Sequence, residues 1–184
     1  MNTFLKWFIL VLFVVAAGVF SYSYFNDGIL NQGLSPKKTV AFEVDDLELK
    51  VVYNRPSKRN REVFGALVPY NKVWRTGANE ATTFQTNKNL IINNKSLPAG
   101  KYTLWTIPND TSWNVIFNSK MYPWGVNETM EAMRDPQFDV ATVNTEPQKI
   151  NTTVEQFTIA FDNSTDHLFL TLAWDTTKVA VPLK

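Results

Sequence analysis

Apolar and polar side chains alternate along most of the chain, and this period of two constrains the fold more than any other feature. The alternation is clear over residues 47–53, 102–105, 113–117, 157–161 and 168–174. On a strand, alternate side chains point to opposite faces, so each of these segments has one apolar face. Turn-forming residues separate them at 93–94, 98–100, 108–110, 162–164 and 175–177. The sequence therefore predicts an all-β fold, an antiparallel β-sandwich of jelly-roll-like form.

One segment breaks the alternation and predicts a short helix within the sandwich. Asn127 is a favourable N-cap for residues 128–134, and Pro136 follows where the helix would end. Two glutamates lie early in this segment and an arginine lies late, as the helix dipole favours. We therefore expect one short helix over residues 128–134.

The N-terminus carries a long apolar run that does not fit the sandwich. Residues 7–25 contain no charged side chain, with Lys6 before them and Asp27 soon after. As a helix this run would span roughly 28 Å, about the thickness of the hydrocarbon core of a bilayer. Because the positive flank of such a helix stays in the cytoplasm, the rest of the chain is expected outside it.

Two interpretations of this run stay open, a retained anchor and a cleaved signal peptide. Tyr22 and Tyr24 suit a membrane–water interface and favour the anchor. The small residues within 16–18 and 21–23 offer cleavage sites and favour the signal peptide. Of the two, we favour the anchor.

The chain therefore divides into three parts. Residues 1–25 are the transmembrane anchor or signal segment, 26–36 are a linker with glycine and proline, and 37–184 are the exported domain. The membrane is the expected partner of residues 7–25. The domain is expected on the periplasmic side of the membrane, or secreted if the signal is cleaved.

The composition excludes several functional classes. The chain has no Cys and one His, which excludes disulfides, thiol nucleophiles, thiolate metal sites and multi-His zinc sites. A net charge of +1 gives no basis for binding nucleic acid through bulk charge. Neither a phosphate-binding glycine motif nor a Gly-x-Ser-x-Gly elbow is present. We therefore predict no cofactor, no metal site and no nucleic-acid partner.

The residues best suited to bind a ligand lie between positions 54 and 83. Four cations lie within 55–61, and a second polar group surrounds Gly77, with aromatic residues between the two. Guanidinium groups beside aromatic rings suit carboxylates, phosphates and the faces of sugars. The candidate ligand-binding residues are Arg55, Arg61, Tyr70, Trp74, Arg75, Asn79 and Glu80.

We expect the segments 55–61 and 74–80 to meet on one side of the sandwich. Glu80 is expected to pair with one of the three arginines, because an unpaired buried arginine is costly. The remaining positive charge would then bind a small anionic or carbohydrate ligand. Two other interpretations stay open: the arginines pin the loops by pairing with acids, or the basic loop contacts a polyanion or a membrane surface.

Several longer motifs resemble one bacterial family. They are Trp-Arg-Thr-Gly-Ala-Asn-Glu-Ala-Thr at 74–82 and the segments 53–57, 61–65, 67–70, 97–104 and 172–175. Over roughly residues 35–183 the chain resembles the family catalogued as domain of unknown function 2911. The resemblance implies an exported β-rich domain and carries no established activity, so it implies no catalytic residue. The chain departs from the family in its long N-terminal apolar run and in a longer stretch at 121–136.

These observations predict a membrane-anchored exported protein whose sandwich is a non-catalytic module, either structural or binding an anionic ligand. The alternative is a cell-envelope hydrolase that uses paired carboxylates, or Asp166 with His167 as general base. A single His at the edge of a strand is more often exposed or hydrogen-bonded than catalytic. The prediction therefore leans away from an enzyme, and no catalytic residue is assigned.

Overall fold

The computed structural model describes residues 2–26 and 34–184, and the chain divides into two units, Met1–Leu34 and Ser35–Lys184. The first unit contains the helix α1, Thr3–Asn26. Its segment Thr3–Ser21 has a mean hydropathy of 2.3, and none of it is buried. A helix of this length and composition can cross a bilayer, and a signal sequence has the same properties. The predicted linker falls mostly on residues 27–33, outside the described ones.

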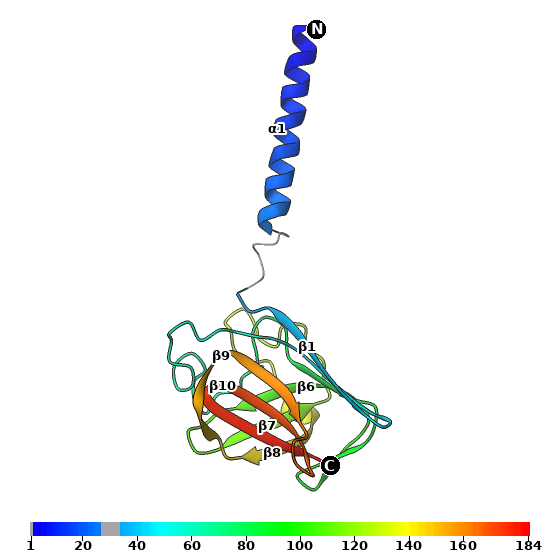
Figure 1. The fold of residues 1–184 in the computed structure, drawn as a ribbon, viewed down its shortest axis with the longest axis vertical. Coiled ribbons are helices and arrows are strands. Elements are labelled where there is room, and N and C mark those ends of the chain that lie inside the picture. The colour runs from blue at the N-terminus through cyan, green and yellow to red at the C-terminus, as the bar shows by residue number, and fades with distance from the viewer. Residues whose placement is uncertain (1, 27–33) are drawn as a thin grey trace. The chain divides into compact units, whose positions relative to one another are not determined.

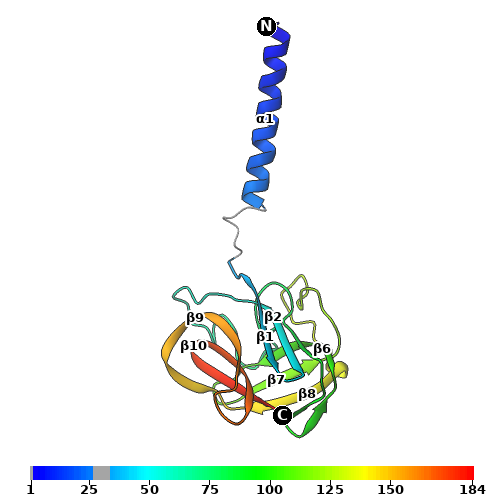
Figure 2. The same ribbon diagram turned by 45° about the vertical axis from the view of Figure 1, so that its right-hand side comes forward.

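The second unit is built of antiparallel strands, as the sequence predicted (Figures 1 and 2). A six-stranded sheet has the order β1-β2-β3-β6-β7-β8, the hairpin β9–β10 forms a second layer, and β4–β5 is a small separate hairpin. The strands are β1 (Lys37–Val44), β2 (Leu47–Asn54), β3 (Thr83–Thr86), β4 (Leu90–Ile92), β5 (Lys95–Leu97), β6 (Gly100–Ile107), β7 (Trp113–Asn118), β8 (Asp139–Thr145), β9 (Gln148–Asp162) and β10 (Leu168–Leu183).

The main core lies between the six-stranded sheet and the β9–β10 hairpin. Apolar side chains from alternate positions of β2, β6 and β7 meet those of β9 and β10 in one buried cluster. Tyr53 of β2 packs edge-on against Phe157 of β9, with ring centroids 5.8 Å apart. Its hydroxyl also accepts a hydrogen bond from the backbone N–H of Ile159 at 2.9 Å. This contact joins the two layers through both apolar and polar groups.

A second, smaller core lies on the opposite face of the β6–β7 pair. Trp105 and Ile116 are paired across these strands and point away from the main core. Tyr122 and Ala81 cover them, and all four side chains are buried. Tyr122 belongs to a segment without regular secondary structure, residues 120–134, which we call the 120–134 loop, and Ala81 belongs to the loop before β3. Both faces of the sheet are therefore buried at this place.

The predicted helix over residues 128–134 is wrong. The segment forms a tight turn, because the side chain of Asn127 accepts hydrogen bonds from the backbone N–H groups of Thr129 and Glu131. Met130 adopts a left-handed backbone conformation, with φ of 64°, that a helix does not allow. The short helix of this domain is the 3-10 turn Pro136–Phe138. Pro136 begins that helix instead of ending one.

The predicted turn at 175–177 is also absent. β10 runs continuously from Leu168 to Leu183, and its register against β9 shifts on either side of Asp175. Asp175 has a φ of 54°, which is typical of a bulge. The polar residues that suggested a turn therefore mark an irregularity within one long strand.

Candidate functional site

The basic segment 55–61 lies against the edge of β9. Ser57 bridges Gln156, and the backbone N–H of Lys58 donates to the carbonyl oxygen of Glu155 at 2.8 Å. Arg55 donates from Nε to the carbonyl oxygen of Phe157 at 3.1 Å and from Nη2 to Oγ1 of Thr158 at 2.9 Å. These bonds fasten the start of the loop to the second layer of the sandwich.

Arg61 and Lys58 of this segment also bond to groups of the protein. Arg61 donates from Nε and Nη2 to the carbonyl oxygens of Lys58 and Ser57, at 3.0 and 2.7 Å. The ammonium group of Lys58 lies 2.5 Å from a carboxylate oxygen of Asp175, at the bulge of β10, and both side chains are mostly buried. The hypothesis that arginines pin the long loop is therefore supported for Arg55 and Arg61. Their partners are backbone carbonyls and a hydroxyl, not the expected acids.

The segment 74–80 begins inside an aromatic cluster. The ring of Trp74 stacks on that of Trp174 at 6.0 Å and contacts Phe157 at 4.9 Å. Its indole N–H donates to the carbonyl oxygen of Gly77 at 3.0 Å. Gly77 leaves no room for a side chain, since an added Cβ would lie 3.0 Å from the carbonyl oxygen of Asn54. The partly buried ring of Trp74 therefore holds the turn at Gly77 through this hydrogen bond.

Arg75 points the other way, toward the 120–134 loop. Its Nη1 donates to the carbonyl oxygen of Trp124 at 3.4 Å. Partial burial lowers the pKa of Arg75 below its usual value. Arg75 therefore lies against a different segment from Arg55 and Arg61.

Asn79 and Glu80 hold the residues that enter the domain from the N-terminal side. Asn79 donates from Nδ2 to the carbonyl oxygen of Ser35 at 3.4 Å, and Glu80 forms an ion pair with Lys37 at 3.2 Å. Asn54 donates from Nδ2 to the second carboxylate oxygen of Glu80 at 2.5 Å. The expectation that Glu80 pairs with an arginine is thus wrong. Segment 74–80 thus contacts Asn54, the residue just before the basic segment 55–61, and the meeting of the two segments stays a prediction.

The cations and hydrogen bonds around Glu80 affect its titration. A hydrogen bond from its own backbone N–H, aided by Lys37 and Asn54 and opposed by partial burial, holds the pKa of Glu80 below its usual value. We call this place, where residues 35–37 join the domain, the attachment end. Here two of the candidate ligand-binding residues fix the incoming chain.

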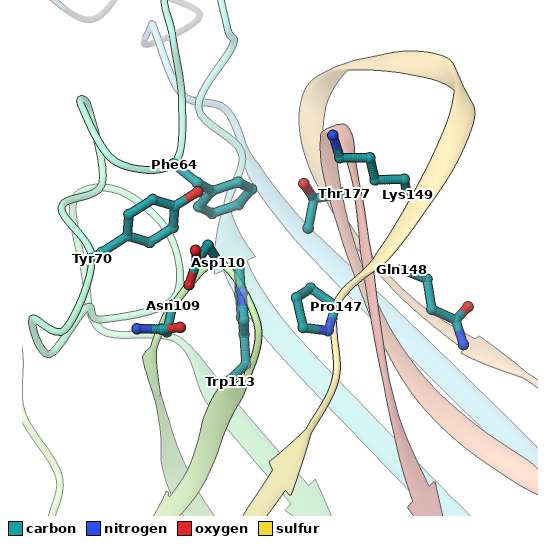
Figure 3. A pocket seen from close by; sticks show the side chains of 9 residues that line it. All are labelled: Phe64, Tyr70, Asn109, Asp110, Trp113, Pro147, Gln148, Lys149 and Thr177. Atoms are coloured by element: carbon teal, nitrogen blue, oxygen red, sulfur yellow. The ribbon is translucent and has the colours of Figure 1, made fainter.

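A cavity of about 200 Å³ lies at another place, between the loops before β7 and the strands β9 and β10. Figure 3 shows its lining residues on two sides. One side carries Phe64, Tyr70, Asn109, Asp110 and Trp113, and the other carries Pro147, Gln148, Lys149 and Thr177. Tyr70 is the candidate residue that lines this cavity, and the other six lie outside it.

Aromatic packing holds the apolar side of the cavity in place. The ring of Phe64 meets Trp113 edge-on at 4.8 Å, Trp174 at 6.2 Å and Trp74 at 6.4 Å. Trp113 and Trp174 are almost completely buried. Trp74 therefore does not line the cavity but packs against Phe64, which does. A ring fixed on three sides offers a rigid surface to a ligand.

Polar groups surround this aromatic surface. Asn109 accepts from the backbone N–H of Thr111 at 3.1 Å and donates from Nδ2 to Oδ1 of Asn71 at 2.8 Å, so its loop is fixed. Gln148 and Lys149 project from the exposed start of β9, and Asp110 is exposed on the facing loop. The cavity thus offers amide groups, one carboxylate and one ammonium group.

Sequence reasoning missed most of the cavity. The sequence showed Asn109 and Asp110 as a turn, Trp113 as a strand residue and Thr177 as part of a turn, and gave no signal for Gln148 or Lys149. Such a site needs four separate segments, which only the fold brings together.

The residues of the alternative hydrolase lie elsewhere. Asp166 and His167 are exposed in the turn between β9 and β10, and neither lines the cavity. His167 exchanges hydrogen bonds with Thr165 through its backbone N–H and carbonyl oxygen. Within residues 2–26 and 34–184 there is no group of three His, Asp or Glu side chains placed to hold a metal ion.

Comparison with known proteins gives one result. The model of a family described as "Protein of unknown function (DUF2911)" matches residues 35–183, which is the second unit almost to its last residue. No curated protein and no solved structure matches the chain.

Proposed function

The chain belongs to the DUF2911 family, and we propose that it is a membrane-anchored, exported binding module that holds a small carbohydrate in the cavity beside Tyr70. The observation that carries this proposal is the cavity itself, with a fixed aromatic wall and a polar rim. Pockets that bind small molecules combine an apolar lining with a few polar groups that orient the ligand. This cavity has that construction.

The lining favours a sugar over a purely apolar ligand. A sugar ring has a face of C–H groups that can pack on Phe64 and Tyr70, and hydroxyl groups around its edge. Asp110 supplies acceptors, and Gln148 and Lys149 supply donors, for such hydroxyls. The cavity of about 200 Å³ is small, so one sugar unit is the appropriate size.

The charges favour a neutral sugar over a strongly anionic ligand. Asp110 and Lys149 contribute one charge of each sign to the rim. Arg55 and Arg61, which were expected to attract an anion, each donate two hydrogen bonds to groups of the protein and lie outside the cavity. The anionic-ligand hypothesis therefore has less support than binding of a neutral carbohydrate.

A ligand screen tests the proposed site. The purified chain is titrated with neutral and acidic monosaccharides while its thermal unfolding is followed, with matched salt as a blank. We expect a neutral sugar to raise the unfolding temperature, since a ligand that binds only the folded state stabilises it. The rise should disappear in Tyr70→Ala and persist in Phe138→Ala, a matched control, since Tyr70 and Phe138 are 38% and 41% exposed. An equal rise in both variants would refute the site.

The anchor is the second part of the proposal. α1 exposes its whole apolar segment, Thr3–Ser21, and the nearby N-terminal charge would stay on the cytoplasmic side. After carbonate washing of membranes, we expect the full-length chain in the pellet. Recovery of a soluble chain that lacks about 20–25 N-terminal residues would instead establish a cleaved signal peptide.

A further inference from the structure

The 120–134 loop exposes an unusual number of large apolar side chains. Trp124, Met130 and Met133 are 58%, 68% and 52% exposed, and Met121 at the start of the loop is 45% exposed. Single exposed apolar residues are normal, but a group of them on one segment marks a surface that is covered by something else.

The underside of this loop is fixed to the domain. Tyr122 packs edge-on against Trp105 at 5.2 Å, and its hydroxyl accepts from the backbone N–H of Asp135 at 2.8 Å. Gly125 lies so close to Trp105 and Ala81 that an added Cβ would approach both to 3.1 Å. Tyr122 and Gly125 therefore attach the loop to the domain. The exposed side chains of Trp124, Met130 and Met133 are not needed for that attachment.

Hydrogen bonds at the tip of the loop fix the turn that contains the exposed Met130. Val126 bridges Ala132, and between them Asn127 accepts hydrogen bonds from Thr129 and Glu131. The backbone N–H of Met130 donates to the carbonyl oxygen of Asn127 at 3.0 Å. Met130 adopts its left-handed conformation, with φ of 64°, inside this network. A largely exposed apolar residue in a strained backbone conformation is a feature associated with function.

The loop lies at the attachment end of the domain. Three neighbouring contacts show this: Asn79 with Ser35, Arg75 with Trp124, and the backbone N–H of Ala81 with the carbonyl oxygen of Pro123 at 3.3 Å. Figures 1 and 2 both show the yellow-green loop at the end of the domain where β1 begins. From Asn26 to Ser35 the chain can span at most about 32 Å. If α1 is anchored in a membrane, this end of the domain stays near that membrane.

The charge of the loop indicates how it would bind. Lys120 and Arg134 balance Glu128 and Glu131, so residues 120–134 have no net charge. Attraction to anionic headgroups is therefore weak. Trp is favoured at the boundary between headgroups and acyl chains, and Met is flexible enough to fill an irregular apolar surface.

We propose that the 120–134 loop is a second membrane contact, which inserts Trp124, Met130 and Met133 into the interface of the bilayer that holds α1. This inference rests on the membrane-anchored form of the proposed function and is independent of the sugar site. The occupant is the lipid surface itself. The neutral loop makes the contact depend on apolar insertion, so it should be insensitive to salt.

Labelling of the full chain in phosphatidylcholine vesicles tests this. Because the native chain has no Cys, Met130→Cys gives a single site for an environment-sensitive fluorophore, and Asp166→Cys gives a control site. Asp166 lies in the β9–β10 turn, beyond the Phe161–Phe42 contact and so at the end of the domain opposite Lys37. Vesicles are washed with carbonate first, and quenching by nitroxide-labelled lipid is then measured.

We expect strong quenching at position 130 and little at position 166, with no change on raising the salt concentration. In the Met130→Cys background, replacing Trp124 and Met133 by Ala should reduce the quenching several-fold. Leu67→Ala, at a residue that is 40% exposed outside the loop, should leave it unchanged. Equal quenching at both labels in retained, full-length chain would overturn the docking while the anchor stands. Loss of the chain in the carbonate wash would overturn the anchor and, with it, the docking.

Discussion

The two buried faces of the β6–β7 pair are packed in different ways. The face toward β9 and β10 joins a large cluster, with side chains from most strands of both layers. The face toward the 120–134 loop buries Trp105 and Ile116 beneath Tyr122, with partly buried residues around them. Regular strands thus cover one face, and an irregular loop covers the other.

The two cores should contribute differently to the stability of the whole sandwich and to that of the loop. A residue of the main core contacts both layers, so its loss weakens the whole sandwich. A residue of the second core contacts mainly the loop and the outer face of the sheet, so its loss is expected to release the loop first. Substitutions in each core, and outside both, should separate the two kinds of stability.

The largest effect is expected for Phe157→Ala, in the main core. Phe157 is completely buried and contacts the rings of Tyr53, Trp74 and Trp174. Its truncation should lower the free energy of unfolding by about 3–5 kcal/mol, because it leaves a cavity between the layers. Chemical denaturation of the purified chain measures this. Phe138→Ala, at an exposed ring, should change the value by less than about 0.5 kcal/mol. Similar losses in the two variants would contradict the assignment of the core.

A smaller and more local effect is expected for Gly125→Ala, beneath the loop. Gly125 has a φ of 75°, and a Cβ there would lie 3.1 Å from Trp105 and from Ala81. The strain should cost about 1–3 kcal/mol. Hydrogen exchange should show lost protection at the Met133 amide, which bonds to the carbonyl oxygen of Gly125, while β2 stays protected.

The matched control for this experiment is Gly100→Ala. An added Cβ at Gly100 meets the side chain of Tyr102 at an ordinary distance of 3.4 Å, so little change is expected there. If Gly125→Ala instead lowers protection equally in β2 and in the loop, the two cores are not separable.

Tyr122→Phe removes one hydrogen bond from the second core and keeps its packing. The phenol oxygen of Tyr122 accepts from the backbone N–H of Asp135 at 2.8 Å. We expect a loss of about 1 kcal/mol, and faster exchange of the Asp135 amide. Tyr70→Phe, at an exposed ring outside this core, should leave that amide unchanged. No difference between the two variants would show that the ring of Tyr122, and not its hydroxyl, holds the loop.

The smallest effect is expected at the attachment end, outside both cores. The pKa of Glu80 in the folded chain lies below its ordinary value of 4.5. The ionised side chain therefore stabilises the fold above pH 4.5, and this stabilisation is lost as the pH falls through the lowered pKa. Because the Glu80 side chain is 42% exposed, this contribution should be about 0–1 kcal/mol. Glu80→Gln should therefore be less stable than the native chain at neutral pH and equal to it in acid. Glu128→Gln, at an exposed residue, serves as control, and a difference that grows in acid would contradict the pairing.

The strands of the sandwich were largely predictable. Alternation placed Trp113, Val115 and Phe117 on one face of β7, and the structure buries all three in the main core. It could not show that Ile116, on the other face, is buried too, because that depends on a loop whose position is not encoded in a period of two. The predicted helix failed for a local reason, since the side chain of Asn127 bonds to the turn that follows it.

The candidate residues were less predictable than the strands. The expectation of an arginine partner for Glu80 rested on the cost of leaving a buried arginine unpaired, but Arg55 and Arg61 donate to backbone carbonyl oxygens. Lys37, which enters from a distant part of the chain, pairs with Glu80 instead. Of the seven candidates, Tyr70 lines the cavity. The opposite wall of the cavity comes from β9 and β10, which are distant from Tyr70 in the sequence.

Repeated and local features could be inferred without a structure: the apolar N-terminal helix, the alternating strands and the family to which residues 35–183 belong. Which polar groups meet depends on the folded arrangement. It joined Glu80 to Lys37, Lys58 to Asp175 and Phe64 to three tryptophans. The physical reason is that side-chain period is a property of neighbouring residues, whereas a cavity or an ion pair depends on segments brought together by burial of the core.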